Sequence, residues 1–386
     1  MGEGALLEKR INMRPILWLT SWYPSRVNPT NGDFVERHAR AVAAFTPLIV
    51  LLVEKDESLS PGKTEIIRTE ENNLIVYKVY YGKSGWGKSL EKILSVLKYR
   101  NLQKKVYAEI SRKYGTPSLV HVHIAMKAGM LALYLKSRYR MPFILTEHWT
   151  GYFKESQPNI YTTGNALRGL IKKVIQQTTQ LFPVSKSLGE KIGETISPVP
   201  FTVIPNVVDT TIFKYEGYVA PVFRFIHPSY LNYQKNPEGM IEAASLLAKQ
   251  GYRFELVLFG NDNPELSTFA AQKEILNTHV FINSFVSYAE VAAQMRKSSA
   301  LLMFSRFENL PCVVLEAVCC GLPVISTRVG GIPEVINERN GILIESEDVE
   351  ALSNAMKKMM DSYSAYDRSG IALSAAEKFS FPVVGK

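Results

Sequence analysis

Short apolar runs alternate with longer amphipathic stretches along the whole chain. The runs predict ten strands, and most are continuously apolar, as is typical of strands covered on both faces. They are residues 16–20, 48–53, 119–124, 143–146 and 181–184 in the first half, and 223–227, 254–259, 280–283, 300–304 and 324–326 in the second. The segments between them can hold crossover helices, so the pattern predicts α/β architecture with doubly wound sheets.

The alternation is interrupted once, by a polar and aromatic stretch around residues 208–222, and then restarts. We interpret this stretch as a linker between two Rossmann-like domains, residues 1–207 and 223–372. Residues 373–386 form a C-terminal segment that would return to the first domain. Two such domains facing each other place the carboxyl ends of their strands on a central cleft, where ligands of these sheets bind.

The composition is that of a globular protein, with 46% hydrophobic and 21% charged residues. The formal net charge of +9 favours anionic partners, such as nucleotide phosphates, an anionic membrane surface or nucleic acid. Residues 1–14 lack the apolar core of an export signal, and no stretch approaches the length of a membrane span. The cysteines Cys312, Cys319 and Cys320 lie close together without zinc-site spacing, which favours reduced thiols in a cytoplasmic protein.

The segment from Lys83 to Lys113 carries nine basic and two acidic residues. Its apolar positions change phase near residue 99, which indicates one drifting helix or two short ones. One interpretation is a basic face that rests on anionic lipids at the inner face of a membrane. The other is the solvated face of an ordinary crossover helix.

The strongest chemical signal follows the predicted strand 300–304. Glu308 lies in a short polar loop, Pro311 fits the first turn of a helix, and Glu316 lies further in. A helix start offers free N–H groups to an anion such as a diphosphate. A carboxylate can accept hydrogen bonds from adjacent hydroxyls of a ribose or a sugar. The alternative is a first-turn charge at Glu308 and a solvated helix residue at Glu316.

The residues that follow extend this signal. Small side chains let the helix pack closely on a sheet, Gly321 suits the helix end, and Pro323 opens the next strand. Gly330 and Gly331 then form a second loop ahead of another helix, with backbone free to approach a phosphate.

The run from Ser305 to Ile336 resembles glycosyltransferase family 4, whose mark is Glu, seven residues and Glu, then a small-rich helix, a Gly-x-Pro-Val strand and a Gly-Gly-x-x-Glu turn. The resemblance implies the GT-B architecture, retention of the anomeric configuration, a UDP- or GDP-linked sugar as cosubstrate, and no required metal or other cofactor. Consistently, the sequence holds no Asp-x-Asp pair for a divalent cation.

The resemblance also implies roles for individual residues. Glu316 would bind the donor ribose and Glu308 the donor sugar. Backbone groups would bind the sugar and phosphates at Asn309, Leu310, Pro311, Gly330, Gly331 and, in the opening loop of the first domain, Gly32. Asp33 could cap the helix that follows Gly32.

Lys235 lies between the first strand of the second domain and a helix. An ammonium there can neutralise charge on the leaving diphosphate, and Lys235 resembles the family's phosphate lysine. Family members usually carry Gly-Arg-Leu where this chain has Ser-Tyr-Leu around Tyr230, so the second cation is missing. Lys235 would then act alone or with Arg306 or Arg328. The alternative is a surface loop lysine.

Histidines and polar residues mark the first domain's side of the cleft. His121 and His123 share one face of a strand, and His123 lies nearer its carboxyl end. His123 resembles the family's cleft histidine, whereas His121 is expected in the core; a metal site is disfavoured for lack of further ligands. Glu147 and His148 resemble the acceptor-side segment, with a capping role as the competing account. In the hinge segment, Asn206 would point into the cleft and Asp209 would be structural.

The sequence therefore predicts a retaining glycosyltransferase with His123, Lys235 and Glu308 at its catalytic centre. It would move a sugar from a nucleotide donor to a hydroxyl of a glycan, glycolipid or small molecule, in surface polysaccharide or glycoconjugate synthesis. The alternative is a catalytically silent or nucleotide-sugar-binding subunit. A Rossmann oxidoreductase is disfavoured because no strand leads into Gly-x-Gly-x-x-Gly, and no nucleic acid partner is expected.

Overall fold

The structure is a computed structural model that describes residues 14–85 and 88–386. The expectation about an export signal in residues 1–14 therefore falls outside the described residues, except for Arg14. Within the described ranges, no helix is both long enough and apolar enough to cross a membrane.

The first domain is built on a seven-stranded sheet in the order β3-β4-β2-β1-β5-β6-β7. All neighbouring strands are parallel except β3, which is antiparallel to β4 at one edge. The strands are β1 (Ile16–Thr20), β2 (Leu48–Lys55), β3 (Thr64–Glu71), β4 (Leu74–Tyr81), β5 (Leu119–His123), β6 (Phe143–Glu147) and β7 (Leu181–Pro183).

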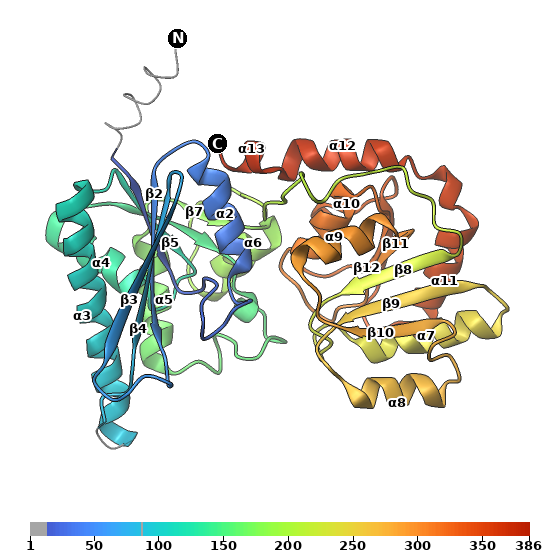
Figure 1. Cartoon of the computed structure of the whole chain (residues 1–386), viewed down its shortest axis with the longest axis horizontal. Helices are drawn as coiled ribbons and strands as arrows, with labels where there is room; N and C mark the ends of the chain where they lie inside the picture. Colours follow the sequence, from blue (N-terminus) through green and yellow to red (C-terminus); the bar gives the residue numbers. More distant parts are fainter. Residues whose placement is uncertain (1–13, 86–87) are drawn as a thin grey trace, which may run out of the picture.

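Helices cover both faces of this sheet. They are α2 (Asp33–Ala43), α3 (Lys88–Tyr114), α4 (Gly129–Tyr139), α5 (Asn165–Gln177) and α6 (Lys186–Thr195), with the short 3-10 helix η1 (Thr150–Tyr152). Figure 1 shows α2 and α6 on the side facing the second domain, and α3, α4 and α5 on the outer side. The sheet is buried between these layers, which explains the continuously apolar central strands.

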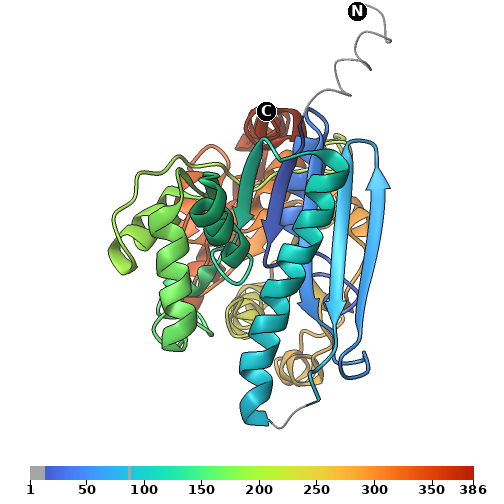
Figure 2. The ribbon, with the colours of Figure 1, turned by 90° about the vertical axis from the view of Figure 1, so that its left-hand side faces the viewer.

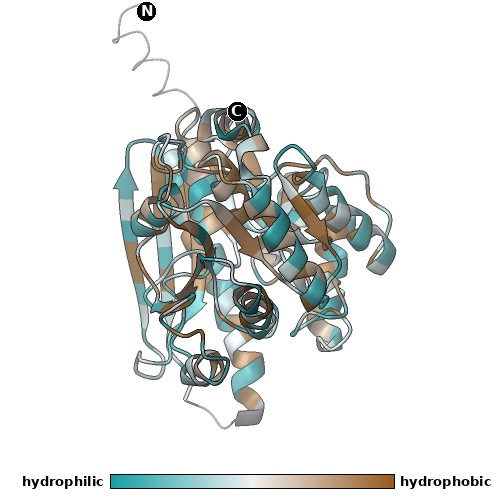
Figure 3. Cartoon of the chain, turned by 90° about the vertical axis from the view of Figure 1, so that its right-hand side faces the viewer, coloured by the Kyte–Doolittle hydropathy of each residue, from teal (hydrophilic) through white to brown (hydrophobic). Residues whose placement is uncertain are grey.

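The second domain has a six-stranded, wholly parallel sheet in the order β10-β9-β8-β11-β12-β13. Its strands are β8 (Phe223–Pro228), β9 (Phe254–Gly260), β10 (Val280–Ser284), β11 (Ala300–Met303), β12 (Val324–Thr327) and β13 (Gly341–Ile344). Its helices are α7 (Pro237–Lys249), α8 (Pro264–Gln272), α9 (Tyr288–Arg296), α10 (Cys312–Cys319), α11 (Val349–Asp361), η2 (Ile332–Glu334) and η3 (Tyr363–Ala365). Figure 3 shows hydrophobic strands enclosed by helices whose outer faces are more hydrophilic.

The end of the chain crosses back to the first domain. Helix α12 (Arg368–Phe379) leads into α13 (Phe381–Val384), which packs on α2. At the crossing, the Val208 N–H donates to the Phe379 carbonyl over 2.8 Å. A side chain at Gly385 would collide with the Ala41 carbonyl, so α13 sits close to α2. Two segments of chain therefore join the domains side by side.

The two doubly wound domains predicted from the sequence are confirmed, and each of the ten predicted strands corresponds to a strand of the structure. Three strands were not predicted: β3, β4 and β13. Strand β3 is an exposed edge strand whose sequence mixes Glu65, Arg68 and Thr69 with isoleucine, so it has no apolar run. The basic segment forms one continuous helix, α3, from Lys88.

Candidate active site

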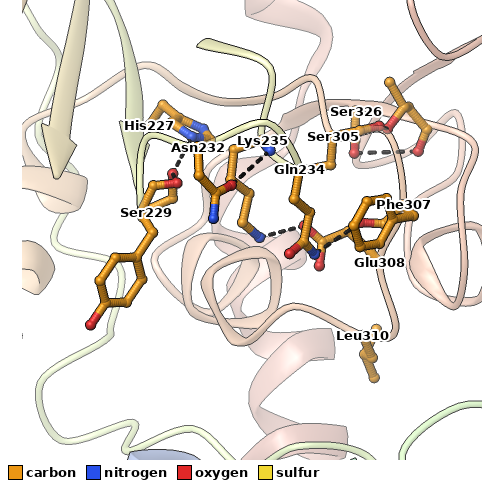
Figure 4. Close-up of polar contacts among 12 residues, drawn as sticks. His227, Ser229, Asn232, Gln234, Lys235, Ser305, Phe307, Glu308, Leu310 and Ser326 are labelled. Atoms are coloured by element: carbon orange, nitrogen blue, oxygen red, sulfur yellow. Dashed lines mark hydrogen bonds and ion pairs between the residues drawn. The ribbon is translucent and has the colours of Figure 1, made fainter. Parts of the chain in front are cut away.

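Lys235 and Glu308 form an ion pair in the second domain, although 73 positions separate them in the sequence. Lys235 lies between β8 and α7, and Glu308 between β11 and α10. These strands are neighbours in the sheet, so their carboxyl ends bring both loops together. Gln234 supports the arrangement by donating its side-chain amide to the Phe307 carbonyl over 3.0 Å (Figure 4).

Glu316 is buried in the second turn of α10 and contacts both domains. The Tyr288 hydroxyl donates to its Oε1 over 3.1 Å, and Nη1 of Arg37, from α2 of the first domain, lies 3.3 Å from the same oxygen. Burial raises the pKa of Glu316, and the positive charge of Arg37 opposes that shift. Both contacts use Oε1, so Oε2 is the oxygen left for a ligand hydroxyl.

Arg37 was not predicted as a site residue. Its guanidinium also pairs with Asp33 over 3.2 Å and lies over the Tyr288 ring, 4.8 Å from the centroid. Arg37 stands one turn after Asp33, in the helix that follows the predicted phosphate loop. The sequence contained one signal that could have identified Arg37 as a site residue: it is an arginine on the buried face of an amphipathic helix.

The loop before α10 is held to the first domain by one side-chain amide from each domain. The Asn309 side-chain amide donates to the His148 carbonyl over 2.6 Å, and that of Asn206 donates to the Leu310 carbonyl over 2.7 Å. Pro311 precedes the helix as its N-cap rather than lying in the first turn, because its ψ of 130° is extended. The Asn206 side chain thus contacts the loop before α10 across the domain boundary.

The glycine pair serves a packing role. Gly331 N–H donates to the Asn309 carbonyl over 2.6 Å, and a Cβ at Gly330, whose φ is +54°, would collide with the Glu308 carbonyl. This N–H is therefore engaged within the protein, and the next element is the 3-10 helix η2 rather than an α-helix. The turn fixes the backbone of the Glu308 loop.

Glu334, at the end of η2, docks on the first domain. Its two carboxylate oxygens accept from the backbone N–H groups of Lys186 and Ser187, over 2.8 and 2.9 Å. These groups begin α6, where the positive end of the helix dipole favours an anion. The second domain thus supplies the carboxylate for a helix start of the first.

Four histidines meet at the carboxyl ends of β5 and β6. His123 lies 3.9 Å from Trp18 and 4.2 Å from His121, and His148 lies 6.0 Å from His123 and 5.6 Å from His38, measured between ring centroids. His121 bonds Thr146 over 2.7 Å, as suits a core histidine. Among the described residues, both ring nitrogens of His123 and of His148 are buried without a hydrogen-bond partner.

Burial is the main cause that lowers the pKa of these histidines, to about 3 for His121 and about 4 for His38. The pKa values of His123 and His148 also lie well below the ordinary value, because of burial and neighbouring histidines. All four rings are therefore neutral at pH 7 and can offer hydrogen bonds but no charge. Buried polar groups without partners are rare, and in this cluster Nε2 of His38 shares that property with both ring nitrogens of His123 and His148 among the described residues.

Glu147 is buried and fully hydrogen-bonded. It accepts from the backbone N–H groups of Ala125, His148 and Trp149 and from the Tyr152 hydroxyl, all within 2.8–3.0 Å. Burial raises its pKa, and these hydrogen bonds oppose that shift. Glu147 therefore holds the backbone of His148 and Trp149 in place, but it does not cap η1, whose start has no side-chain cap.

The opening loop depends on Gly32. This residue is left-handed, with a φ of +79°, and a side chain there would collide with the Trp22 backbone. Gly32 is the N-cap of α2, so the expectation that Asp33 caps the helix is wrong: Asp33 is its first residue and pairs with Arg37. Asp209 accepts from Thr211 within its own turn, which is a structural role.

At the position of the missing arginine, Tyr230 reaches the first domain. Its hydroxyl lies 2.6 Å from the Thr30 hydroxyl. The two suggested replacement cations are engaged by the loop after β13: Arg306 with Glu347 over 2.9 Å, and Arg328 with Glu345 over 3.6 Å. Arg37 is instead the cation that enters the site from the opposite domain.

Two family descriptions match the chain. "Glycosyl transferases group 1" matches residues 219–372, and "Glycosyltransferase Family 4" matches residues 70–212. The chain belongs to the family 4 glycosyltransferases. Its two facing α/β domains are of the GT-B type.

Individual relatives agree with this assignment. A glycogen synthase of Mycobacterium tuberculosis is 23% identical over 91% of this chain and 87% of its own length. The Bacillus subtilis protein TuaC, named for a proposed glycosyltransferase role in teichuronic acid biosynthesis, is 23% identical over 89% of the chain and 88% of its own.

Two solved structures share the fold of this glycosyltransferase. Sucrose-phosphate synthase from Thermosynechococcus elongatus superimposes with a TM-score of 0.78 at 16% identity, over 96% of each chain. Anabaena HepE, solved in complex with UDP, gives 0.69 at 15% identity, over 96% of this chain and 97% of its own.

Proposed function

We propose that this glycosyltransferase retains the anomeric configuration and transfers a sugar from a UDP- or GDP-linked donor to an acceptor hydroxyl. The observation that carries the proposal is the arrangement of Lys235 with Glu308 at one sheet edge and of buried Glu316 in the adjoining helix. UDP is the first nucleotide to test, because HepE of the same fold was solved with UDP and with UDP-glucose. A role in polysaccharide or glycoconjugate synthesis is supported by the relatives named above.

The donor would lie along α10. Oε2 of Glu316 would accept from ribose hydroxyls, while Arg37 and Tyr288 hold Oε1 and keep the carboxylate oriented. The Lys235 ammonium would neutralise the leaving diphosphate, and Glu308 would accept from hydroxyls of the transferred sugar.

In the reaction, the bond from the sugar's anomeric carbon to the phosphate oxygen breaks and a bond to the acceptor oxygen forms on the same face. The acceptor's proton passes to the departing phosphate, so no protein nucleophile is required. Neutral His123 would hydrogen-bond the sugar, because both of its buried ring nitrogens lack partners among the described residues. His148 and Asn206 would lie on the acceptor side, with Glu147 holding their loop.

A cytoplasmic position at an anionic membrane surface is part of the proposal. Helix α3 carries most of the basic residues of the Lys83–Lys113 segment on the outer side of the first domain. Lysines and arginines near such a surface are attracted to its lipids.

Incubation with isotope-labelled UDP- and GDP-sugars tests the function. We expect one donor to lose its sugar to an acceptor or to water, with product of retained configuration by NMR. Donor binding without either reaction would favour the silent, nucleotide-sugar-binding subunit. Product of inverted configuration would refute the retaining mechanism.

A further inference from the structure

The amino-terminal half of α3 carries an apolar stripe that the fold leaves uncovered. Leu90 is 53% exposed, Ile93 61%, Val96 38% and Leu97 40%. The carboxyl-terminal half of the same helix is conventional, since Val106 is buried in the core. Figure 2 shows α3 and α5 on the same face of the first domain, with the first turns of α3 extending past the sheet. Contiguous exposed apolar side chains of this kind mark a binding surface.

The stripe forms one wall of a groove of about 1020 Å³. Its opposite wall is the start of α5, and Met130 of α4 contributes to the lining. The apolar side chains are Ile93, Val96, Leu97, Met130, Leu167 and Leu170. A groove of this size and lining suits a hydrocarbon chain rather than a free sugar, whose hydroxyls would find few partners there.

The groove continues towards the active site through two smaller cavities. The next, of about 210 Å³, shares Lys55, Lys127 and Leu167 with the groove and also touches Trp22. A third, of about 510 Å³, shares Trp22 and Leu167 with the second and extends to Trp149. Trp149 directly follows His148, whose ring nitrogens are unpartnered within the described structure. Because neighbouring cavities share lining residues, we treat the three together as one furrow that leads from the outer face of the first domain to Trp149.

Two lysines flank the middle of this furrow. Lys55 pairs with Glu91 over 3.1 Å, whereas no carboxylate of the described residues lies within ion-pair distance of Lys127. Partial desolvation, together with the charge of Lys55, lowers the pKa of Lys127. Over the groove and the second cavity together, Lys55, Lys92 and Lys127 outnumber Glu54 and Glu91 and leave one net positive charge, which favours an anionic group such as a phosphate.

We propose that the furrow binds the acceptor and that the acceptor is a lipid phosphate drawn from a bilayer. The hydrocarbon chain would lie in the α3–α5 groove and the phosphate beside Lys55 and Lys127. The hydroxylated head would reach Trp22 and Trp149, next to His148. The order of apolar groove, cationic passage and aromatic end matches the order of chain, phosphate and sugar in such a molecule. This assignment rests on the proposed glycosyl transfer and names its acceptor class.

Photo-crosslinking tests the assignment on the full chain. The probe is a long-chain isoprenyl phosphate with a diazirine in its tail, presented in phosphatidylcholine vesicles, and labelled peptides are mapped by mass spectrometry. We expect label in α3 before residue 100 and in α5 near Leu170. Label elsewhere would overturn the proposal, as would complete competition by millimolar inorganic phosphate, since the tail would then contribute nothing.

Matched variants test whether the groove residues themselves bind the crosslinking probe. Ile93→Glu should reduce crosslinking roughly tenfold, because it places a charge in the apolar groove. Leu373→Glu is the control, since Leu373 is 65% exposed on α12, and it should label as the parent chain does. Lys127→Ala should reduce labelling about fivefold at low salt. Equal labelling of the Ile93 and Leu373 variants would refute the groove.

Two further measurements distinguish a failure of the lipid-site proposal from a failure of the proposed glycosyl transfer. UDP binding by the unaltered chain is measured by calorimetry: binding without lipid capture would refute the groove alone. Lipid capture without binding of any nucleotide would refute the proposed transfer while keeping the lipid site. Sedimentation tests whether a second copy of the chain occupies the groove: a monomer is expected, and a dimer that Ile93→Glu dissociates would overturn the lipid assignment.

Discussion

Arg37 on α2 of the first domain and Glu316 on α10 of the second form a buried ion pair across the cleft, with 3.3 Å between Nη1 and Oε1. The pair joins a helix that follows the opening loop to the carboxylate proposed to bind the donor ribose. In the proposed site Arg37 is therefore a positioning residue: its charge opposes the rise in the pKa of Glu316 that burial causes, and its contact with Oε1 leaves Oε2 for the donor ribose.

Breaking this pair should cost stability. Arg37→Met leaves the Glu316 carboxylate buried without its cation, which we expect to lower the free energy of unfolding by about 3 kcal/mol in urea titrations. In a Glu316→Gln background the same change should cost much less, because no charge is then stranded. Arg40→Met is the control on the same helix, since its ion pairs are exposed and should contribute less than about 1 kcal/mol. Equal losses in both backgrounds would contradict the coupling.

The ribose assignment predicts a binding defect. Glu316→Gln should weaken binding of the correct nucleotide roughly tenfold or more, because hydrogen bonds to a charged acceptor contribute about 1.5–3 kcal/mol. Tyr288→Phe should weaken it less, since it removes only a group that orients the carboxylate. Calorimetry with UDP and GDP measures both. An unchanged dissociation constant in Glu316→Gln would exclude Glu316 from the ribose site.

Lys235 should affect turnover more than binding. Charge on the diphosphate grows as the glycosidic bond breaks, so its ammonium should stabilise the transition state more than the ground state. We expect Lys235→Ala to lower kcat on the order of a hundredfold, with a smaller change in donor KM. Arg306→Ala should keep near-normal turnover, because Arg306 is paired with Glu347. If the two variants showed the opposite order, the phosphate cation would be Arg306.

Acid should destabilise the protein through its buried histidines. Five of them have pKa values lowered mainly by burial in the folded state: His38, His121, His123, His148 and His227. The unfolded chain binds these protons below about pH 6.5 and the folded chain does not, so stability is present above that pH and is lost as pH falls. Each histidine contributes about 1.4 kcal/mol per pH unit.

Urea titrations at pH 7.0, 6.0 and 5.0 measure this slope. Glu147 and Glu316 oppose it at the acid end, because burial raises their pKa values and the folded state then takes up protons. His38→Leu should reduce the slope by about one proton. Stability that stays constant from pH 7.0 to 5.0 would show that the histidines titrate normally in the folded state.

The sequence was enough to place the residues of the proposed donor side near one another, because local rules position them. Glu308, Glu316 and Lys235 follow strands of one parallel sheet, and the topology of such a sheet brings the loops at its carboxyl edge together. The sequence could not supply Arg37, since its partner is 279 positions away in another domain and no local spacing encodes that contact. Edge strand β3 was missed for a different reason: its polar, exposed residues share the composition of a loop.

The furrow, too, could be predicted from the sequence only in part. The change of apolar phase along α3 was visible in the sequence, but which half of the helix faces the core was not predicted; the structure buries Val106 and exposes Ile93. That the outward stripe lies opposite Leu170 of α5 depends on helix packing, which periodicity alone does not determine.

The crossing of the chain between the domains constrains how the cleft can open. At Val208 and Phe379 the two connecting segments are joined by a backbone hydrogen bond, whereas Thr30 with Tyr230 and Arg37 with Glu316 join the domains through side chains. Side-chain contacts can part while the backbone hydrogen bond stays in place. An opening between the domains that keeps this backbone hydrogen bond would therefore be a rotation about the crossing of the two segments.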